Sequence, residues 1–96
     1  MVSVMRFRVA EPAPAIFQGE LTVALDRLRA QRGFVRGHIA RAVDDAHLWV
    51  LATEWEGVGA YRRALSSYDV KVNAVPVLSC AIDEPNAFEV LESRDR

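Results

Sequence analysis

The segment AHLWVLATEW, residues 46–55, most constrains how this chain can fold. Side chains alternate along an extended strand, and here both faces are apolar: Leu48, Val50 and Ala52 on one, and Trp49, Leu51 and Trp55 on the other. A strand that is apolar on both faces is normally covered on both. A layer is therefore required on each side of this strand, from the same chain or from a second copy of it.

Hydrophobic periodicity and turn residues predict the other elements. Residues 13–31 place their apolar side chains on one helix face, with Pro14 suited to the first turn and Gly33 to the stop. In chain order we expect a strand at 2–10, a loop at 11–15 that overlaps the start of this helix, strands at 33–43 and 46–55, a short helix after Gly57 with Tyr61, Ala64 and Leu65 facing inward, and a strand at 86–92.

The segment at residues 69–83 is ambiguous. Val70 and Val72 alternate as they would in a strand, whereas the apolar residues from position 74 onward follow helical spacing. We expect a helix from Asn73, which can serve as its N-cap. Pro76 then falls in the first turn, where its missing N–H costs no intrahelical hydrogen bond.

These elements give the order β-α-β-β-α-β, which is the ferredoxin-like arrangement of the α+β class with a four-stranded antiparallel sheet. We expect one domain at residues 1–92 and a charged tail at residues 93–96. Two helical segments can cover only one face of such a sheet, and the chain has no residues left for the other. We therefore expect a homodimer in which two sheets pack face to face.

Composition excludes several classes of partner. The chain of 96 residues has 12 basic and 13 acidic side chains and no run of like charge, so we expect neither nucleic acid nor a membrane as partner. Its N-terminus lacks the pattern of a signal peptide. The single cysteine, Cys80, cannot form an internal disulfide, which fits the cytoplasm, and its apolar surroundings predict a buried, inert thiol.

Motifs for metals, phosphates or an activated serine are absent from the sequence. A hairpin turn centred on residues 44–45 pairs His38 with Leu51. It leaves His47 four residues away, or roughly 13 Å, so the two histidines cannot share a metal within one chain. His38 is expected on the same side as Phe34 and Arg36, where it can be a general base or a hydrogen-bonded structural residue.

Trp55 is the residue that points most directly to a ligand site. It ends an apolar strand just before a helix, where a side chain can line a cavity between the sheet and its helices. The alternative is that Trp55 simply packs in the core, with an acceptor for its N–H close by. Tyr61 shares this ambiguity, since it can donate a hydrogen bond or belong to the inward face of its helix.

Several features together resemble the antibiotic biosynthesis monooxygenase superfamily of dimeric α/β barrels. They are the βαββαβ order, the GFVRG segment, ATEWEGVGAY at the end of the third strand and DEPNAFEVLE near the C-terminus. The resemblance implies a pocket in each protomer between the helices and the inner sheet face, with Trp55 as its lining tryptophan. It also implies candidate activities that include cofactor-independent oxygenation of phenols and haem degradation.

The match to the haem-degrading branch fails at two positions. Met5 stands where that branch has a strand asparagine, and Asn73 stands where it has a haem-ligating histidine. We therefore do not expect haem degradation. A haem-handling protein would instead need an iron ligand from His38 or Tyr61. Asn73 can hydrogen-bond a phenol oxygen, as asparagines do in quinone-forming oxygenases, or it can cap a helix.

The resemblance thus implies a monooxygenase that uses neither cofactor nor metal and acts on an electron-rich aromatic or hydroquinone-type molecule. The expected roles are pocket wall and donor for Trp55, substrate contacts for Asn73 and Tyr61, and proton or charge management for His38 or Arg36. The alternative is a non-catalytic small-molecule-binding or structural dimer on the same fold. A closed core filled by Trp55, Met5 and Phe88 would favour this alternative, and an open cavity with convergent polar groups would favour the monooxygenase.

Overall fold

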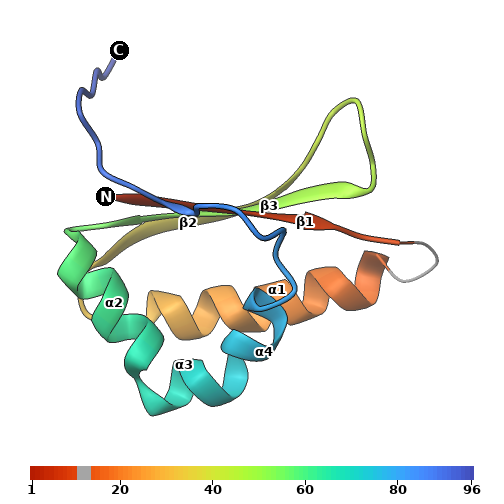
Figure 1. Ribbon diagram of the computed structural model, residues 1–96, viewed down its shortest axis with the longest axis horizontal. Coiled ribbons are helices and arrows are strands. Elements are labelled where there is room, and N and C mark those ends of the chain that lie inside the picture. Colours follow the sequence, from red (N-terminus) through yellow and green to blue (C-terminus); the bar gives the residue numbers. More distant parts are fainter. Residues whose placement is uncertain (11–13) are drawn as a thin grey trace.

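A computed structural model describes residues 1–10 and 14–96. It has a four-stranded antiparallel sheet in the order β2-β3-β1-β4, and Figure 1 shows the helices gathered on one side of it. The fold class is therefore the predicted ferredoxin-like α+β class. The elements are β1 (Val2–Arg8), α1 (Pro14–Arg29), β2 (Phe34–Arg41), β3 (Leu48–Trp55), α2 (Val58–Ser66), α3 (Tyr68–Asn73), α4 (Val75–Leu78) and β4 (Ala87–Phe88).

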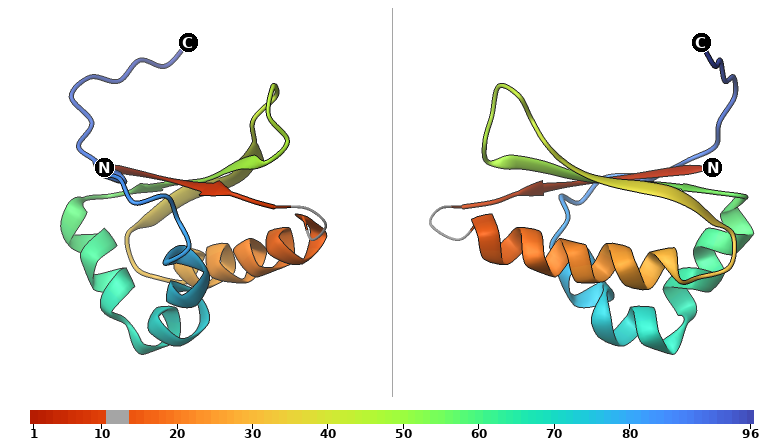
Figure 2. Two further views of the ribbon diagram at one scale, coloured as in Figure 1. Left: turned by 45° about the vertical axis from the view of Figure 1, so that its right-hand side comes forward. Right: turned by 180° about the vertical axis from the view of Figure 1, so that it is seen from behind.

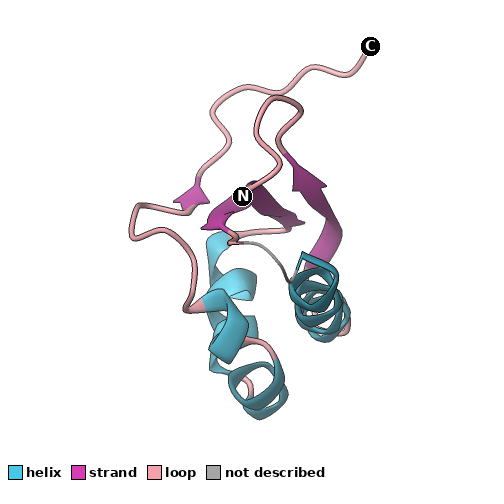
Figure 3. Ribbon diagram, turned by 90° about the vertical axis from the view of Figure 1, so that its right-hand side faces the viewer, coloured by secondary structure: helices cyan, strands magenta, loops and turns pink. Residues whose placement is uncertain are grey.

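The two faces of the sheet differ in how well they are covered. Trp49, Leu51 and Trp55 of β3 are buried beneath the helices, on what we call the inner face. Leu48, Val50 and Ala52 alternate with them on the outer face, and all three are only half-buried. Figure 3 shows helices on one side of the strands, as expected from the number of helical residues. The outer face is thus apolar and has no helix over it among the described residues.

α1 packs its apolar stripe on this sheet. Leu21, Ala24 and Leu28 are buried at the predicted helical spacing. Phe17 stacks edge-on between Phe7 and Trp49, with ring centroids 5.3 Å and 5.9 Å away. The predicted start of the helix at residue 13, and much of the loop expected at 11–15, fall outside the described residues.

The register of the β2–β3 hairpin corrects two expectations. His38 lies opposite Ala52 rather than Leu51. A bulge between Phe34 and Arg36 adds one residue to β2 and reverses the side-chain alternation there. Phe34 consequently packs inward against Trp55, with ring centroids 5.3 Å apart, while Arg36 and His38 face outward. The prediction that these three side chains share a face was therefore wrong.

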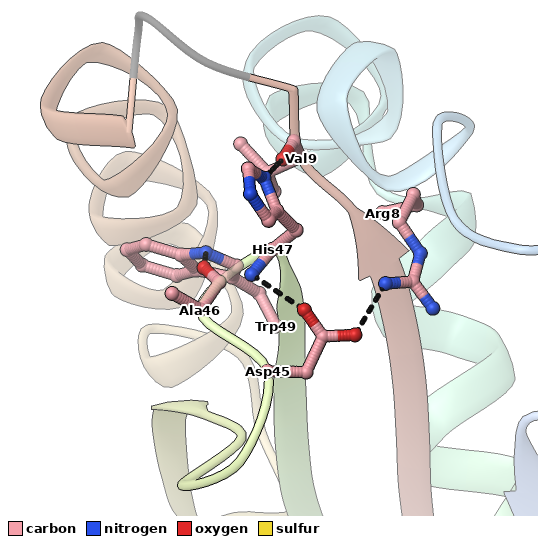
Figure 4. A network of polar contacts seen from close by, with 6 residues as sticks. All are labelled: Arg8, Val9, Asp45, Ala46, His47 and Trp49. Atoms are coloured by element: carbon pink, nitrogen blue, oxygen red, sulfur yellow. Dashed lines mark hydrogen bonds and ion pairs between the residues drawn. The ribbon is translucent and has the colours of Figure 1, made fainter.

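The end of this hairpin is fastened to β1 by the contacts in Figure 4. Asp45 accepts a hydrogen bond from Arg8 Nη1 at 2.6 Å and one from the backbone N–H of His47 at 3.0 Å. His47 Nδ1 lies 2.9 Å from the carbonyl oxygen of Val9. The Arg8 guanidinium is the main reason that the pKa of Asp45 lies below its usual value.

α2 begins after Gly57 as predicted, whereas the helix expected from Asn73 begins earlier, at Tyr68 of α3. Ser67 caps α3 by accepting a hydrogen bond from Val70 N at 3.3 Å. Asn73 is the last residue of that helix and not an N-cap, and its side chain donates to Asp69 Oδ1 at 2.7 Å. Pro76 does lie in the first turn of α4. Cys80, just beyond α4, is exposed, so the expected core thiol was also wrong.

β4 is much shorter than the predicted strand at residues 86–92. Phe88 pairs with Val2 and Ala87 with Ser3, and pairing ends there. Phe88 thus lies opposite Val2, the first residue of β1. Residues 89–96 continue without regular structure.

Candidate functional site

The five residues predicted for the site lie in three separate places. Trp55 and Tyr61 are buried together between the sheet and α2, with ring centroids 5.7 Å apart. Asn73 is exposed at the end of α3. Arg36 and His38 lie on the outer face of the sheet. A single chain thus brings two of the five residues into contact.

A hydrogen-bonded trio surrounds the inner pair, and we call it the Tyr61 network: Ser3, Tyr61 and Asn86. Ser3 Oγ donates to Tyr61 Oη at 3.1 Å, and Tyr61 Oη donates to Asn86 Oδ1 at 3.1 Å. Burial raises the pKa of Tyr61 above 10.0, and the hydrogen bond from Ser3 acts in the opposite direction. The phenol is therefore held neutral at physiological pH.

Trp55 ends β3 in the middle of an aromatic cluster. It is 2% exposed, and its Nε1–H donates to Thr53 Oγ1 at 2.9 Å. Phe34 and Tyr61 both meet its ring edge-on. Its one donor is thus satisfied within its own strand, as a buried tryptophan requires.

A groove of about 640 Å³ runs beside the Tyr61 network, and we call it the α2 groove. Ala87, one of the walls of the groove, pairs with Ser3 of the network and directly follows Asn86. The walls are Met1, Gly57, Val58, Arg62 and residues 87–90. Arg62 follows Tyr61 in α2 and supplies a positive charge at this wall. Two walls of the groove, Arg62 and Ala87, are thus sequence neighbours of Tyr61 and Asn86.

The outer face carries His38 and Arg36 in a shallower setting. They line a depression of about 240 Å³ with Val2, Val4, Ala52, Thr53 and Glu54. Arg36 Nε lies 3.6 Å from Glu54 Oε1, so its charge is already partly matched. His38 is exposed, and no hydrogen bond from its ring is found within the described residues.

Asn73 lies at a third place, a groove of about 360 Å³ between α1 and the pair α3 and α4. Its other walls are Glu20, Val23, Val72, Pro76 and Val77. The Asn73 amide already donates to Asp69, which also binds Arg27 at 3.3 Å. These polar contacts belong to the helix surface and are remote from the Tyr61 network in sequence and in fold.

Sequence reasoning missed Ser3, Thr53 and Asn86. Ser3 interrupts the apolar inward positions of β1, where Met5 and Phe7 are buried. A small polar residue at such a position must find a partner. That signal was available, but its partner Tyr61 lies 58 residues away, beyond the reach of local patterns.

Two further findings concern the part of the chain that the structure describes. No three His, Cys, Asp or Glu side chains lie close enough together there to bind a metal ion. None of its helices is long and apolar enough to cross a membrane.

The model of the antibiotic biosynthesis monooxygenase family matches residues 1–72, three quarters of the chain. The chain belongs to this family. Within it, SnoaB from Streptomyces nogalater is a cofactor-independent oxygenase of known structure. SnoaB has 27% sequence identity to the chain, and the two superpose with a TM-score of 0.81 over 96% of this chain and 93% of SnoaB.

More distant structures share the fold. Rv0793 from Mycobacterium tuberculosis superposes with a TM-score of 0.71 at 19% identity, covering 99% of this chain and 95% of that one. A conserved protein from Methanosarcina mazei gives 0.73 at 15% identity, covering 90% and 84%. Among curated proteins there is no match. These structures thus support the fold of this family member, and its substrate has to be inferred from the residues of its own site.

Proposed function

We propose that this chain is a cofactor-independent monooxygenase for an electron-rich aromatic or hydroquinone-type small molecule, and that it acts as a homodimer. The observation that carries the proposal is its similarity to SnoaB, a cofactor-independent oxygenase, over 96% of the chain at 27% identity. The Tyr61 network adds support, because it places a phenol, a hydroxyl and a carboxamide beside the α2 groove.

In the proposed reaction the substrate supplies all the electrons. Its anion passes one electron to O2, the two radicals combine at a ring carbon, and the hydroperoxide formed there loses water. A CH2 group and O2 become C=O and H2O, so the four electrons that reduce O2 come from the carbon that is oxidised. The task of the protein is to favour the substrate anion and to keep bulk water away.

Tyr61 and Asn86 are proposed to hold the substrate oxygen. The neutral Tyr61 phenol can turn its O–H from Asn86 to a phenolate, and the Asn86 amide has two N–H donors of its own. Trp55 is proposed as the adjoining wall. Access would come from the α2 groove, by displacement of the Met1 and Ala87 walls. The roles predicted for Asn73, His38 and Arg36 stay predictions, and these residues lie outside this cluster.

Oxygen uptake tests this proposal. Purified protein would be given a panel of anthrones and hydroquinones with no flavin or metal added. We expect uptake above the uncatalysed rate, and a loss of about tenfold or more in Tyr61→Phe, because the donor to the developing charge is gone. Tyr68→Phe is the matched control, since Tyr68 is exposed on α3. Full activity in a folded Tyr61→Phe protein would remove Tyr61 from the mechanism.

Trp55 is tested in the same assay. Trp55→Phe should lower the uptake if the indole forms the wall of the site. Trp49→Phe is its control, because Trp49 is similarly buried on β3 but packs on Phe17, at the far end of the strand. Equal losses in both variants, matched by equal losses of stability, would assign Trp55 to the core alone.

A non-catalytic binding dimer is the second candidate, and one observation favours it. Met5 and Trp55 are both buried, as expected of a scaffold, whereas Phe88, the third residue expected in a closed core, is 45% exposed. No uptake with any substrate of the panel, together with saturable binding of the same compounds, would support this candidate over the oxygenase.

A further inference from the structure

Ser3 is the member of the Tyr61 network to which the proposed function gives no role. It lies on β1, a strand that is paired on both sides, to β3 and to β4. Its side chain is 2% exposed, on an inner face that is otherwise apolar along this strand. A buried hydroxyl costs free energy unless it is hydrogen-bonded. Its one partner among the described residues, Tyr61 Oη, therefore determines what Ser3 can do.

The backbone holds the three members of the network at one place. Figure 2 shows in both views that β1 begins, and α2 lies, at the same end of the molecule. The carbonyl oxygen of Asn86 accepts a hydrogen bond of 2.7 Å from the backbone N–H of Val4, the residue after Ser3. The ring of Tyr61 packs edge-on against Trp55. The Tyr61 oxygen is thus fixed between Ser3 and Asn86, which are both anchored on β1.

The direction of each hydrogen bond in the network follows from its chemistry. The carbonyl oxygen Oδ1 of Asn86 can only accept, so the single phenolic hydrogen of Tyr61 is directed to it over 3.1 Å. The Tyr61 oxygen then accepts from Ser3, whose hydroxyl is the donor over 3.1 Å. Donation from Ser3 polarises the phenol and makes its O–H a stronger donor. Ser3 thus occupies the Tyr61 oxygen as an acceptor and leaves its hydrogen for donation.

A ligand oxygen that reaches Tyr61 therefore meets donors. An ionised phenol only accepts hydrogen bonds, and it can take the phenolic O–H together with an N–H of the Asn86 amide. A neutral phenol brings a hydrogen that needs an acceptor, and Ser3 already occupies the Tyr61 oxygen. The arrangement thus favours the ionised ligand over the neutral one.

We propose that Ser3 is a positioning residue that keeps Tyr61 a donor, so that the site selects the ionised form of a phenolic ligand. This rests on the proposed function, in which Tyr61 and Asn86 hold the substrate oxygen. Ser3 does not contact the ligand and acts through the orientation of the phenolic hydrogen. Alanine at position 3 would free the Tyr61 oxygen to accept, and the preference for the ionised ligand would decrease.

The chromophoric probe p-nitrophenol tests this role without any oxygenase activity. It titrates near neutral pH and its ionised form absorbs visible light, so the absorbance reports the ionised fraction of the bound probe. We expect the protein to increase this fraction, and Ser3→Ala to bind the ionised form about fivefold more weakly. Ser3→Thr keeps the hydroxyl and should restore most of the affinity. Phe7→Leu is the control for lost stability alone, because Phe7 is buried on the same face of β1 but packs on Phe17.

The Tyr61 hydroxyl also gives a signal in the protein without ligand. The chain has two tyrosines, so in a Tyr68→Phe background a carbon-13 label at tyrosine Cζ reports on Tyr61 alone. Burial raises the pKa of Tyr61, and the hydrogen bond from Ser3 opposes this. Ser3→Ala should therefore move the Cζ resonance at neutral pH and raise the pKa further. Phe7→Leu should do neither.

Two results would overturn the role of Ser3. One is a folded Ser3→Ala protein that keeps both the Cζ resonance and the ionised fraction of bound probe of its parent. The other is a parent protein that leaves the probe unbound, or no more ionised than in solution. Oxygen uptake with the anthrones and hydroquinones judges the oxygenase separately. No uptake by a protein that passes both tests would remove the oxygenase and leave Ser3 as a positioning residue of a binding site.

Discussion

Tyr61 shows how one buried polar side chain depends on residues far away in sequence. Its hydroxyl accepts from Ser3 on β1 and donates to Asn86 just before β4, so three separate parts of the chain meet at one oxygen atom. None of the described buried side-chain nitrogen or oxygen atoms is left without a partner. Replacing the phenol would leave the Ser3 hydroxyl without its acceptor, at a cost of about 1–3 kcal/mol of unfolding free energy.

The raised pKa of Tyr61 predicts a loss of stability in alkali. Above pH 10.0, the ordinary pKa, the unfolded chain releases this proton while the folded chain still binds it. The unfolding free energy should then fall as the pH rises, since stability falls wherever the folded state binds more protons. Urea unfolding between about pH 8 and pH 11 would measure it.

The comparison for this titration is Tyr61→Phe. The variant should be less stable at neutral pH but should lose less stability on going to alkaline pH. Tyr68→Phe should retain the full alkaline loss of the parent protein. Identical slopes for the parent and Tyr61→Phe would show that Tyr61 does not contribute to the alkaline transition.

At the scale of elements, the contact between the β2 entry and α2 leaves no room for a side chain at Gly33. Gly33 has a φ of +90°, and an added Cβ would lie 2.4 Å from the Cβ of Ala60 in α2. Its carbonyl oxygen also accepts a hydrogen bond from Glu56 N at 2.8 Å. The turn before β2 and the first turn of α2 are thus held against one another, and neither can move alone.

Gly33→Ala should therefore be strongly destabilising. Both the positive φ and the clash with Ala60 oppose a side chain, and we expect a loss of about 2–4 kcal/mol. Gly19→Ala is the control, because a Cβ there meets nothing within 4 Å and α1 should gain about 0.5–1 kcal/mol. Chemical denaturation of the two variants measures the difference. A Gly33→Ala protein as stable as its parent would contradict the contact.

The hydrogen bonds of Asp45 in Figure 4 predict a contribution to stability that is lost in acid. The folded pKa of Asp45 is lowered, so its contribution to stability is complete above the unfolded pKa, near 3.9, and is lost as the pH falls through the folded value. Asp45→Asn should abolish that part of the acid loss, whereas Asp44→Asn should keep it. The urea midpoint followed from about pH 5 to pH 2 distinguishes the two variants.

The sequence predicted those elements whose signal is local, and it did not predict features that depend on pairing with distant residues. α1 and the two faces of β3 followed from periodicity, because each side chain reports its own burial. The bulge at residue 35 could not be predicted from the sequence, because one extra residue does not change the kinds of residue that make up β2. The Ser67 cap was a local signal that was overlooked. Of the site, the Trp55–Tyr61 pair was anticipated, but its partners Ser3, in β1, and Asn86, just before β4, are distant in sequence.

At the scale of the whole molecule, the uneven cover of the sheet is the main feature. Helices bury the inner face, whereas the outer face exposes a stripe of half-buried valine, leucine and alanine. Figure 1 shows the segment after β4 leaving the sheet near the N-terminus, and its apolar residues Val90 and Leu91 are exposed. These features support the proposed homodimer and give it a specific surface.

A charge on the outer face should dissociate that homodimer. Val50→Lys places an ammonium in the middle of β3 on the outer side, where face-to-face packing would bury it unpaired. We expect a monomer in sedimentation velocity, and a melting temperature that no longer rises with protein concentration. Arg8→Lys, at the end of β1, is the control and keeps the charge unchanged. A dimer that persists in Val50→Lys would place the interface elsewhere.

The bulge at residue 35 has a consequence for insertions and deletions. It is the point at which β2 changes from contributing Phe34 to the aromatic core to presenting Arg36 and His38 to the outer surface. Most substitutions of Val35 itself should be tolerated, because its side chain is exposed. Deleting the same residue would force the strand to give up either its anchor on Trp55 or its alignment with the rest of β3. We therefore expect position 35 to accept most substitutions but not a deletion.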